Sequence, residues 1–258
     1  MAKALVINPN TSLEMSRGIR STAERVFQPP WSSCTVNAPA GPESLESWRD
    51  YQLGGVASLP LLQTLEDVDG VVLACFGDPG LYAMKEMARI PVVGIGEAAL
   101  SMALLLGGRF GILAGMGRAV GMMDAMVRTY GLESRYAGTL ALEVRVATLE
   151  QDPPATLDLL TRAANQMLER GADVLVLGCA GLTGFSAPLA ARIPFTIIDP
   201  VEAGCRMLKA VVESGLDVSR LGLYSRPAAQ PMRNTQTLFS PEMAGFLKKW
   251  ESEGGMGA

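Results

Sequence analysis

The sequence predicts an α/β protein of two pseudo-symmetric half-domains, each a mostly parallel four-stranded sheet flanked by helices, with the active site in the cleft between them. Three observations support this. Short apolar runs alternate with segments of helical character, which is typical of parallel sheets with right-handed crossovers. Runs such as Val71–Ala74 are apolar at every position, as in strands buried on both faces. One stretch of strand, cysteine, glycine turn and helix also occurs twice.

The repeated stretch defines the domain organisation. Its first copy runs from Asp69 to Gly80 and contains Cys75, and its second runs from Asp173 to Gly184 and contains Cys179. An internal repeat of this kind indicates two similar structural units, here with one cysteine each. We assign residues 1–98 together with 209–258 to the first half-domain and residues 99–208 to the second.

The first half begins with a buried strand, followed by a helix that Thr11 or Ser12 can cap and that ends before Gln28-Pro-Pro-Trp31. Strands are expected at Ala4–Ile7, Cys34–Val36, Gly70–Cys75 and Pro91–Val93. Helices are expected from about Ser12 to Phe27, Ser44 to Leu65, Gly80 to Ala88 and Glu97 to Leu106.

The second half repeats this order from Arg109–Leu113, which resembles the first strand. Further strands are expected at Tyr136–Thr139, Val174–Leu177 and Phe195–Ile198, with a last one at Leu221–Tyr224. Helices are expected at Ala119–Tyr130, Pro154–Arg170 and Val201–Ser214. The tail Gly254–Ala258 is expected to fray.

The composition excludes several classes of function. The net charge is −4 and the basic residues are scattered, so we expect neither nucleic-acid nor membrane partners. The chain has no apolar run long enough for a membrane span and opens without a signal sequence, so we expect a cytoplasmic protein. Four cysteines without framework spacing fit reduced thiols. Histidine is absent, which removes Ser-His-Asp and Cys-His catalysis and most zinc sites.

The matched cysteines are the candidate catalytic residues. Each lies between a strand end and a helix N-terminus, where the helix dipole and free N–H groups should lower the thiol pKa toward neutral. Two such thiols facing each other across a cleft can invert a stereocentre, because one removes a proton while the other returns a proton to the opposite face. The substrate would be a small molecule with an acidic C–H next to a carbonyl, and the scheme needs no metal and no cofactor. Cys34 and Cys205 lack this pattern and are expected to be structural.

The chain resembles the aspartate/glutamate/hydantoin racemase superfamily, and its hydantoin racemase branch most closely, over about residues 3–215. The matching pieces are Ile7-Asn-Pro-Asn-Thr-Ser12, Ala74–Leu81, Gly94–Ala98, Leu177–Gly181 and Ile198–Val201. The resemblance implies that Cys75 and Cys179 form the acid/base pair and that Asn10 contacts the substrate. It also implies that backbone groups at Phe76, Gly77, Ala180 and Gly181 hold the substrate's carbonyl oxygens.

The substrate stays open within this superfamily. Many relatives carry hydroxyl residues where this chain has Ala114–Gly117, and many carry Asp where Gly77 stands. The leading hypothesis is a racemase for 5-monosubstituted hydantoins, with allantoin or an acidic amino acid as alternative substrates. Decarboxylase relatives use one cysteine, so the second cysteine argues against that reaction. A non-catalytic two-lobe binding protein is the alternative from another class. We expect a homo-oligomer, although the sequence does not fix its size.

Three other features have simpler interpretations. Gly94-Ile-Gly96 fits a dinucleotide-binding pattern nominally, but it does not follow the first strand of a βαβ unit, so a tight turn is the better interpretation. Asp78 and Asp199 are each expected to cap the helix that follows them. The methionine-rich run Met116–Met126 is expected to be a helix packing face that can also form one wall of the pocket.

Overall fold

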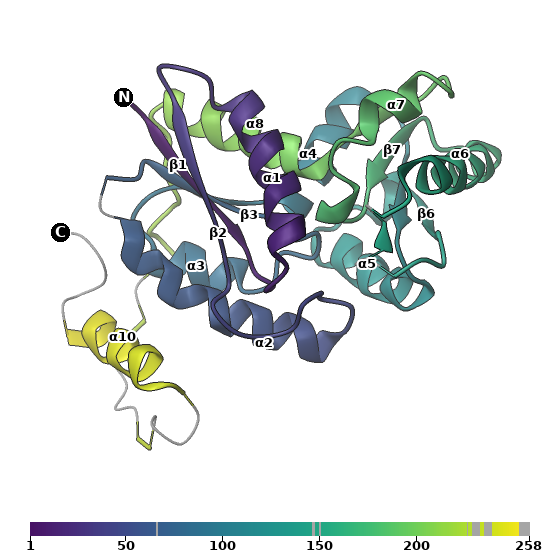
Figure 1. Ribbon diagram of the computed structural model, residues 1–258. Coiled ribbons are helices and arrows are strands. Elements are labelled where there is room, and N and C mark those ends of the chain that lie inside the picture. The colour runs from purple at the N-terminus through teal and green to yellow at the C-terminus, as the bar shows by residue number, and fades with distance from the viewer. Residues whose placement is uncertain are drawn as a thin grey trace.

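Two parallel four-stranded sheets form the framework of the protein (Figure 1). The computed structural model describes residues 1–65, 67–145, 148–149, 151–225, 227–228, 233–234 and 239–252. The first sheet has the order β2-β1-β3-β4 and the second has the order β6-β5-β7-β8. Every neighbouring pair of strands in both sheets is parallel. The predicted fold class is therefore confirmed.

The strands agree with the apolar runs of the sequence. In the first sheet they are β1 Lys3–Asn8, β2 Ser32–Asn37, β3 Gly70–Leu73 and β4 Val92–Gly94. In the second sheet they are β5 Phe110–Ala114, β6 Tyr136–Ala141, β7 Val174–Leu177 and β8 Thr196–Ile198. The central strands β1, β3, β5 and β7 are almost entirely buried, because helices cover both of their faces.

Helices connect successive strands in each half. The first half contains α1 Leu13–Val26, α2 Trp48–Ser58, the 3₁₀ helix η1 Leu59–Leu65, α3 Leu81–Met87 and α4 Ile95–Leu106. The second half contains α5 Gly117–Thr129, η2 Glu133–Arg135, α6 Pro153–Glu169, η4 Ala180–Leu182, α7 Ser186–Ala190 and α8 Pro200–Glu213. Helix α10 Pro241–Ser252 lies near the C-terminus.

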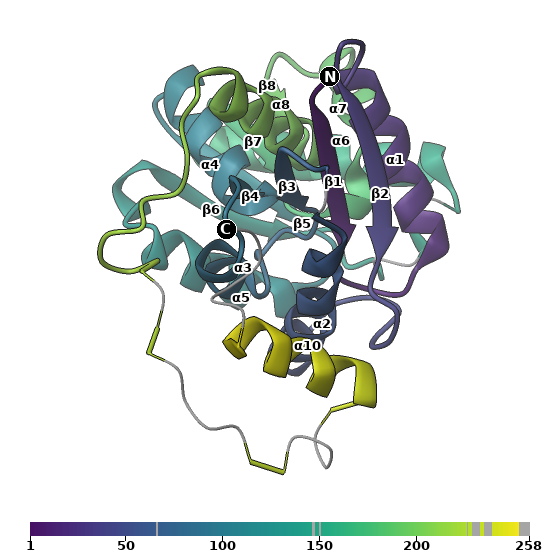
Figure 2. The same cartoon turned by 90° about the vertical axis from the view of Figure 1, so that its left-hand side faces the viewer.

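One apolar core is shared by the two halves. Alternate residues of the first sheet, such as Ala4, Val6 and Val72, face a cluster that also includes Phe110 and Val176 of the second sheet. Helices α1, α4, α5 and α8 contribute to this shared core. Figure 2 shows α1 and α8 on one face of the first sheet, with α2, α3 and α10 on the other. The shared core holds the two sheets in one fixed arrangement, which matters for a site built from both.

Two expectations about individual elements were wrong, and one helix was not expected. The helix expected over residues 44–65 begins only at Trp48, with Ser47 as N-cap, and continues from Leu59 as a 3₁₀ helix. Pro60 lacks an N–H group, so it cannot continue the α-helical hydrogen bonds. The stretch Leu221–Tyr224 is a turn and not a strand, because Gly222 has a φ of +81° and its carbonyl accepts a bond from the N–H of Ser225. Helix α10 was not expected.

Two other expectations stay untested. The tail Gly254–Ala258 lies outside the described residues. The division of the chain into residues 1–98 with 209–258 and residues 99–208 stays a prediction. Helix α8 starts in the expected second half-domain and packs against α1, α4 and β3.

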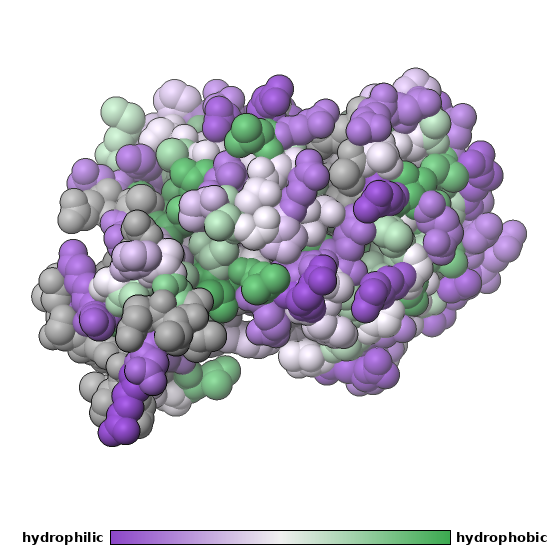
Figure 3. Space-filling model, turned by 60° about the horizontal axis from the view of Figure 1, so that its bottom comes forward, coloured by the Kyte–Doolittle hydropathy of each residue, from purple (hydrophilic) through white to green (hydrophobic). Residues whose placement is uncertain are grey.

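Apolar side chains also reach the surface. Trp48, Leu53 and Val56 of α2 are exposed, and Figure 3 shows hydrophobic residues between hydrophilic ones on the face that includes α2. Such a surface is compatible with the expected homo-oligomer, which stays a prediction.

Gly204 sets how closely α8 approaches α4, and this gives a test of the shared core. A Cβ atom at Gly204 would lie 2.7 Å from Ile95 Cγ2 and 3.2 Å from Val72 Cγ1. We expect Gly204→Ala to lower the free energy of unfolding by about 1–3 kcal/mol, since an overpacked core must distort. Gly121→Ala in α5, where nothing lies within 4 Å, should instead raise it by up to about 1 kcal/mol. Urea unfolding followed by circular dichroism measures the free energy of unfolding of both variants. Equal changes in the two variants would contradict the close packing of α8 against α4.

Candidate active site

The two cysteine loops leave the sheets at matching points. Strand β3 ends at Leu73 and β7 ends at Leu177, and in each half the cysteine is two residues further on. The loops start in the same way, because Ala74 N–H donates to the carbonyl of Ile7 on β1 and Gly178 N–H donates to that of Leu113 on β5. Cys75 and Cys179 therefore lie beyond the carboxyl ends of their central strands, where open α/β sheets bind ligands.

Both cysteines line one cavity between the two halves. Its wall includes residues from both cysteine loops, from the loop before α1, from the segment before α2 and from α5: Asn10, Met15, Leu45, Glu46, Tyr51, Ala74, Cys75, Phe76, Gly115, Met116, Ala119, Met123, Gly178, Cys179 and Ala180. No lysine or arginine occurs in this set of described residues. Three methionines make the wall adaptable. The methionine-rich run therefore contributes Met116 and Met123 to the pocket, as expected.

The cavity is narrow. Only about 40 Å³ of it is free for water, which is room for a few water molecules. A larger ligand is accommodated if wall side chains move. Methionines are suited to such movement, because their side chains are unbranched and have three rotatable bonds.

The pKa of Cys75 differs from the sequence-based expectation. Burial raises the pKa of this thiol well above its usual value, and the nearby Cys179 and Asp78 raise it further. The prediction of a pKa lowered toward neutral was therefore wrong for Cys75. The expected helix N-terminus is also not next to Cys75, because α3 begins only at Leu81, and loss of contact with water then decides the direction of the shift. The Sγ atom of Cys75 lies 3.8 Å from the carbonyl oxygen of Phe76, within reach of a weak hydrogen bond from a thiol.

Cys179 has a different environment. It is the N-cap of η4, and its Sγ accepts a hydrogen bond from the backbone N–H of Gly181 at 3.3 Å. A donor aimed at sulfur favours the thiolate over the thiol. The two sulfur atoms thus have different partners: that of Cys75 faces a carbonyl oxygen, and that of Cys179 accepts from an N–H group.

Asn10 lies at the edge of the cavity with a fixed orientation. Its Oδ1 accepts hydrogen bonds from Asn8 Nδ2 at 2.8 Å and from Ser12 N–H at 2.9 Å. Its Nδ2 has only a weak partner, the sulfur of Met15 at 3.2 Å. Because a thioether is a poor acceptor, this N–H₂ group can turn to a carbonyl oxygen of a ligand. The side chain of Asn10 can therefore donate a hydrogen bond to a ligand, whereas its oxygen is already engaged by two donors of the protein.

The other predicted contacts divide into two groups. Phe76 and Ala180 line the cavity, whereas Gly77 and Gly181 are not among its lining residues. The N–H of Gly181 is directed at Cys179. Gly77 has a φ of +116°, and a Cβ atom there would lie 2.4 Å from the ring of Tyr51, so only glycine fits.

Tyr51 is a site residue that the sequence did not single out. Its hydroxyl donates to the carbonyl of Phe76 at 2.8 Å, and burial raises its pKa well above 10. It lies on α2, far from both cysteine motifs in the sequence, so no local pattern points to it.

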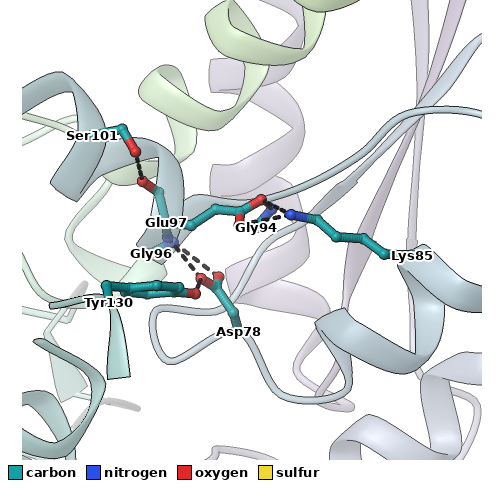
Figure 4. A network of polar contacts seen from close by, with 7 residues as sticks. All are labelled: Asp78, Lys85, Gly94, Gly96, Glu97, Ser101 and Tyr130. Carbon is teal, nitrogen blue, oxygen red and sulfur yellow. Dashed lines mark hydrogen bonds and ion pairs between the residues drawn. The ribbon is translucent and has the colours of Figure 1, made fainter. Parts of the chain in front are cut away.

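Buried carboxylates tie each cysteine loop to the next strand and helix. Asp78 accepts hydrogen bonds from the N–H groups of Gly96 at 2.9 Å and Glu97 at 2.7 Å, so it caps α4 (Figure 4). The expectation that Asp78 caps the helix directly after it was wrong, because α3 begins at Leu81 with Gly80 as its N-cap and has no side-chain cap. Its positive φ of 47° turns the side chain back toward α4.

Asp199 makes the corresponding tie in the second half. As expected it caps the following helix, accepting from the N–H groups of Val201 at 3.0 Å and Glu202 at 3.2 Å. It also accepts from Thr183 Oγ1 and from Gly184 N–H, both at 2.8 Å, which holds the Cys179 loop. Both loops are thus fixed by a carboxylate that also caps the next long helix.

The remaining candidates have structural roles. Cys34 is exposed on β2 and Cys205 is buried on α8, so neither faces the cavity. The carboxylate of Asp78 fills the space beside Gly94 and Gly96, where a Cβ atom would lie 2.4 Å and 2.7 Å from its atoms. That space is closed to a pyrophosphate, which agrees with the interpretation as a tight turn.

The described residues contain no group of three or more His, Cys, Asp or Glu side chains arranged to hold a metal ion. Within the same ranges, no helix is both long enough and apolar enough to cross a membrane.

Comparison with known proteins gives a consistent result. The family model described as Asp/Glu/Hydantoin racemase matches residues 5–208. A hydantoin racemase of Pseudomonas sp. (strain NS671) is 34% identical, over 87% of this chain and 92% of that protein. One of Paenarthrobacter aurescens is also 34% identical, over 87% and 97%. Among solved structures, an allantoin racemase from Klebsiella pneumoniae superposes with a TM-score of 0.86 at 32% identity, covering 93% of this chain and all of that one.

The unequal cysteines lead to a prediction about thiol reactivity. At pH 7.5 iodoacetamide should modify Cys179 faster than Cys75, because only the thiolate reacts and Cys75 is held as a thiol. Peptide mass spectrometry gives the rate for each cysteine, with exposed Cys34 as an internal reference and buried Cys205 as the unreactive control. The Cys75 rate should keep rising above pH 9, since burial raises its pKa. Faster modification of Cys75 than of Cys179 would contradict the assignment.

Proposed function

The chain belongs to the Asp/Glu/hydantoin racemase family, and from this premise we propose that it inverts the C5 stereocentre of 5-monosubstituted hydantoins by proton transfer between Cys75 and Cys179. The family makes it a racemase and hence an isomerase. It also sets aside the alternative of a non-catalytic binding protein. The observation that supports the finer proposal is that the two thiols line one methionine-lined cavity, with no lysine or arginine among its described lining residues.

The mechanism uses the inequality of the two cysteines. In the first step the Cys179 thiolate takes the proton from C5, and the electrons of that C–H bond move into the C5–C4 bond to form an enolate. In the second step the Cys75 thiol gives its proton to C5 from the opposite face. The product has the inverted configuration, with Cys75 as thiolate and Cys179 as thiol. Two acid/base groups of this kind are sufficient, since nothing is oxidised or reduced.

The enolate oxygen needs donors, and the cavity offers several. Asn10 Nδ2 is held only by the sulfur of Met15. The backbone N–H groups of Phe76 and Ala180, on the two cysteine loops, donate no hydrogen bond within the described part of the chain. Donors that are in place before the charge develops stabilise the transition state more than donors that must first reorganise. The predicted roles of Gly77 and Gly181 are then indirect, because each supports the neighbouring cysteine loop.

The lining residues favour a neutral ring over a free amino acid. Aspartate or glutamate would bring at least one buried carboxylate, and no cationic side chain lines the described cavity to pair with it. Their α-proton is also less acidic than the C5 proton of a hydantoin. Apolar C5 substituents would contact Met15, Met116, Met123, Leu45 and Ala119.

Allantoin is the second candidate substrate. It carries the same ring with a polar ureido group at C5, and the Klebsiella pneumoniae protein at 32% identity is named an allantoin racemase. Glu46 is the one acidic residue that lines the described cavity, and it could accept hydrogen bonds from ureido N–H groups. The remaining wall is largely apolar, which is why the hydantoin with an apolar substituent comes first.

Loss of optical rotation of L-5-benzylhydantoin tests the two-cysteine mechanism. We expect Cys75→Ala and Cys179→Ala each to lower kcat by about 10²- to 10⁴-fold, because each removes one acid/base group. Cys34→Ala, which removes an exposed cysteine outside the cavity, should leave the rate unchanged. If either active-site variant keeps most of its activity, the mechanism is wrong.

Solvent exchange gives an independent check of the two faces. In deuterated water, Cys75→Ser and Cys179→Ser should each lose racemisation. Each variant should still exchange the C5 proton of one enantiomer with solvent, and the enantiomer that exchanges should differ between the two variants. Proton NMR with separate L- and D-substrate follows this. Exchange of both enantiomers at equal rates in one variant would indicate a single base that reaches both faces.

A substrate panel separates the candidates. Initial rates with 5-benzyl-, 5-isobutyl- and 5-methylthioethylhydantoin should exceed those with allantoin by about tenfold or more, because the wall matches apolar groups. Aspartate and glutamate should not react. Allantoin as the best substrate would favour the second candidate. A cytoplasmic location and a homo-oligomeric state stay predictions, and light scattering on the purified protein tests the latter.

A further inference from the structure

Asp78 is a buried carboxylate whose hydrogen bonds extend beyond its role as a helix cap. It follows Cys75 by three residues, and its backbone N–H donates to the carbonyl of Cys75 at 3.0 Å. Its Oδ2 accepts a third side-chain hydrogen bond, from the hydroxyl of Tyr130 at 3.1 Å (Figure 4). Tyr130 follows the last residue of α5 and belongs to the second half of the molecule. The loop of one catalytic cysteine is therefore fastened to the opposite half.

We propose that Asp78 and Tyr130 are positioning residues that hold the Cys75 thiol at a fixed place against the α5 wall of the cavity and keep it in its acid form. This inference rests on the proposed function of Cys75 as a proton donor. Helix α5 also carries Ala119 and Met123, which line the cavity. An α-helix is a stiff element, so a bond at its C-terminal end fixes its cavity-lining side relative to Cys75.

A matching contact supports a functional role for this bond. In the second half, Thr183 follows the Cys179 loop, and its Oγ1 lies 2.8 Å from Oγ1 of Thr22 on α1 of the first half. Thr183 Oγ1 also contacts the carboxylate of Asp199 at 2.8 Å. Each cysteine loop is thus connected to a capping carboxylate and to one hydroxyl from the opposite half. Two such bridges hold the two thiols at a set spacing, and racemisation requires that spacing because both sulfurs must reach one carbon.

The negative charge of Asp78 has a second effect, on the protonation of the Cys75 thiol. Burial raises the pKa of Asp78 to about 7, against the lowering effect of its hydrogen bonds to Gly96, Glu97 and Tyr130. The charged form of Asp78 in turn raises the pKa of Cys75. The titratable groups beside Cys75 are Cys179 and Tyr51. Those beside Asp78 are Glu97, Tyr130 and Tyr82. Glu97 is in turn paired with Lys85 at 2.7 Å. None of the groups directly beside Cys75 is cationic, so the site favours a protonated Cys75.

The first test removes one hydroxyl. In Tyr130→Phe we expect kcat for hydantoin racemisation to fall about tenfold to hundredfold, since small displacements of a reacting group cost this much. KM should change by less than about twofold, because no ligand contact is removed. The matched control is Tyr136→Phe, whose hydroxyl contacts Asp124 and Thr139 away from the cavity and whose loss should leave kcat and KM unchanged. Equal kcat values for the two variants would overturn the proposal.

The second test needs no substrate and measures the charge effect directly. In a Cys179→Ala background, the pH midpoint for iodoacetamide modification of Cys75 is determined with and without Asp78→Asn. Asparagine keeps the shape and an acceptor oxygen but removes the charge, so the midpoint should fall by about one pH unit. A purely structural role for Asp78 would leave the midpoint unchanged, and that result overturns the proposal even if Tyr130→Phe fails to fold. Absence of hydantoin turnover with a shifted midpoint would instead reject the proposed function alone.

Discussion

Two buried carboxylates control the geometry of the two cysteine loops at the candidate active site. Asp78 and Asp199 each accept several hydrogen bonds from backbone N–H groups, and each connects a cysteine loop to the helix that starts after the neighbouring strand. A buried carboxylate is costly unless its oxygens are fully bonded, so these connections are stable only in one arrangement. The glycine-rich loops would otherwise have many conformations available, and the positions of the two thiols depend on these ties.

In both halves a carboxylate connects the cysteine loop to the following long helix, but the carboxylate comes from a different segment in each half. In the first half the carboxylate lies in the cysteine loop, and Gly94 at the end of β4 leaves room for it. In the second half the carboxylate follows β8 as Asp199, and the cysteine loop supplies the donors Thr183 and Gly184. This difference within a duplicated framework makes the two cysteine environments unequal. A negative charge is placed close to Cys75, whereas an N–H donor is placed on Cys179.

Inequality of this kind suits an acid/base pair, because one member must start protonated and the other deprotonated. The narrow cavity strengthens this inequality, since burial penalises a second negative charge. The same burial explains why the pKa of Cys75 was expected in the wrong direction. Helix dipoles and glycine turns can be recognised in a sequence, but the depth at which a side chain is placed cannot. Tyr51 was missed for a related reason, since its contact with Phe76 spans two separate segments.

The sequence by itself determined the α/β class, the strands of both sheets, the duplicated plan and the two cysteines, because hydrophobic periodicity and an internal repeat are local signals. It also indicated Asp199 as a helix cap. Only the tertiary structure decided which helix Asp78 caps, that Tyr130 reaches it from the other half, and that Gly77 and Gly181 support the site without lining it. These facts depend on contacts between distant segments, and the packing of the shared core, which no short stretch encodes, brings those segments together.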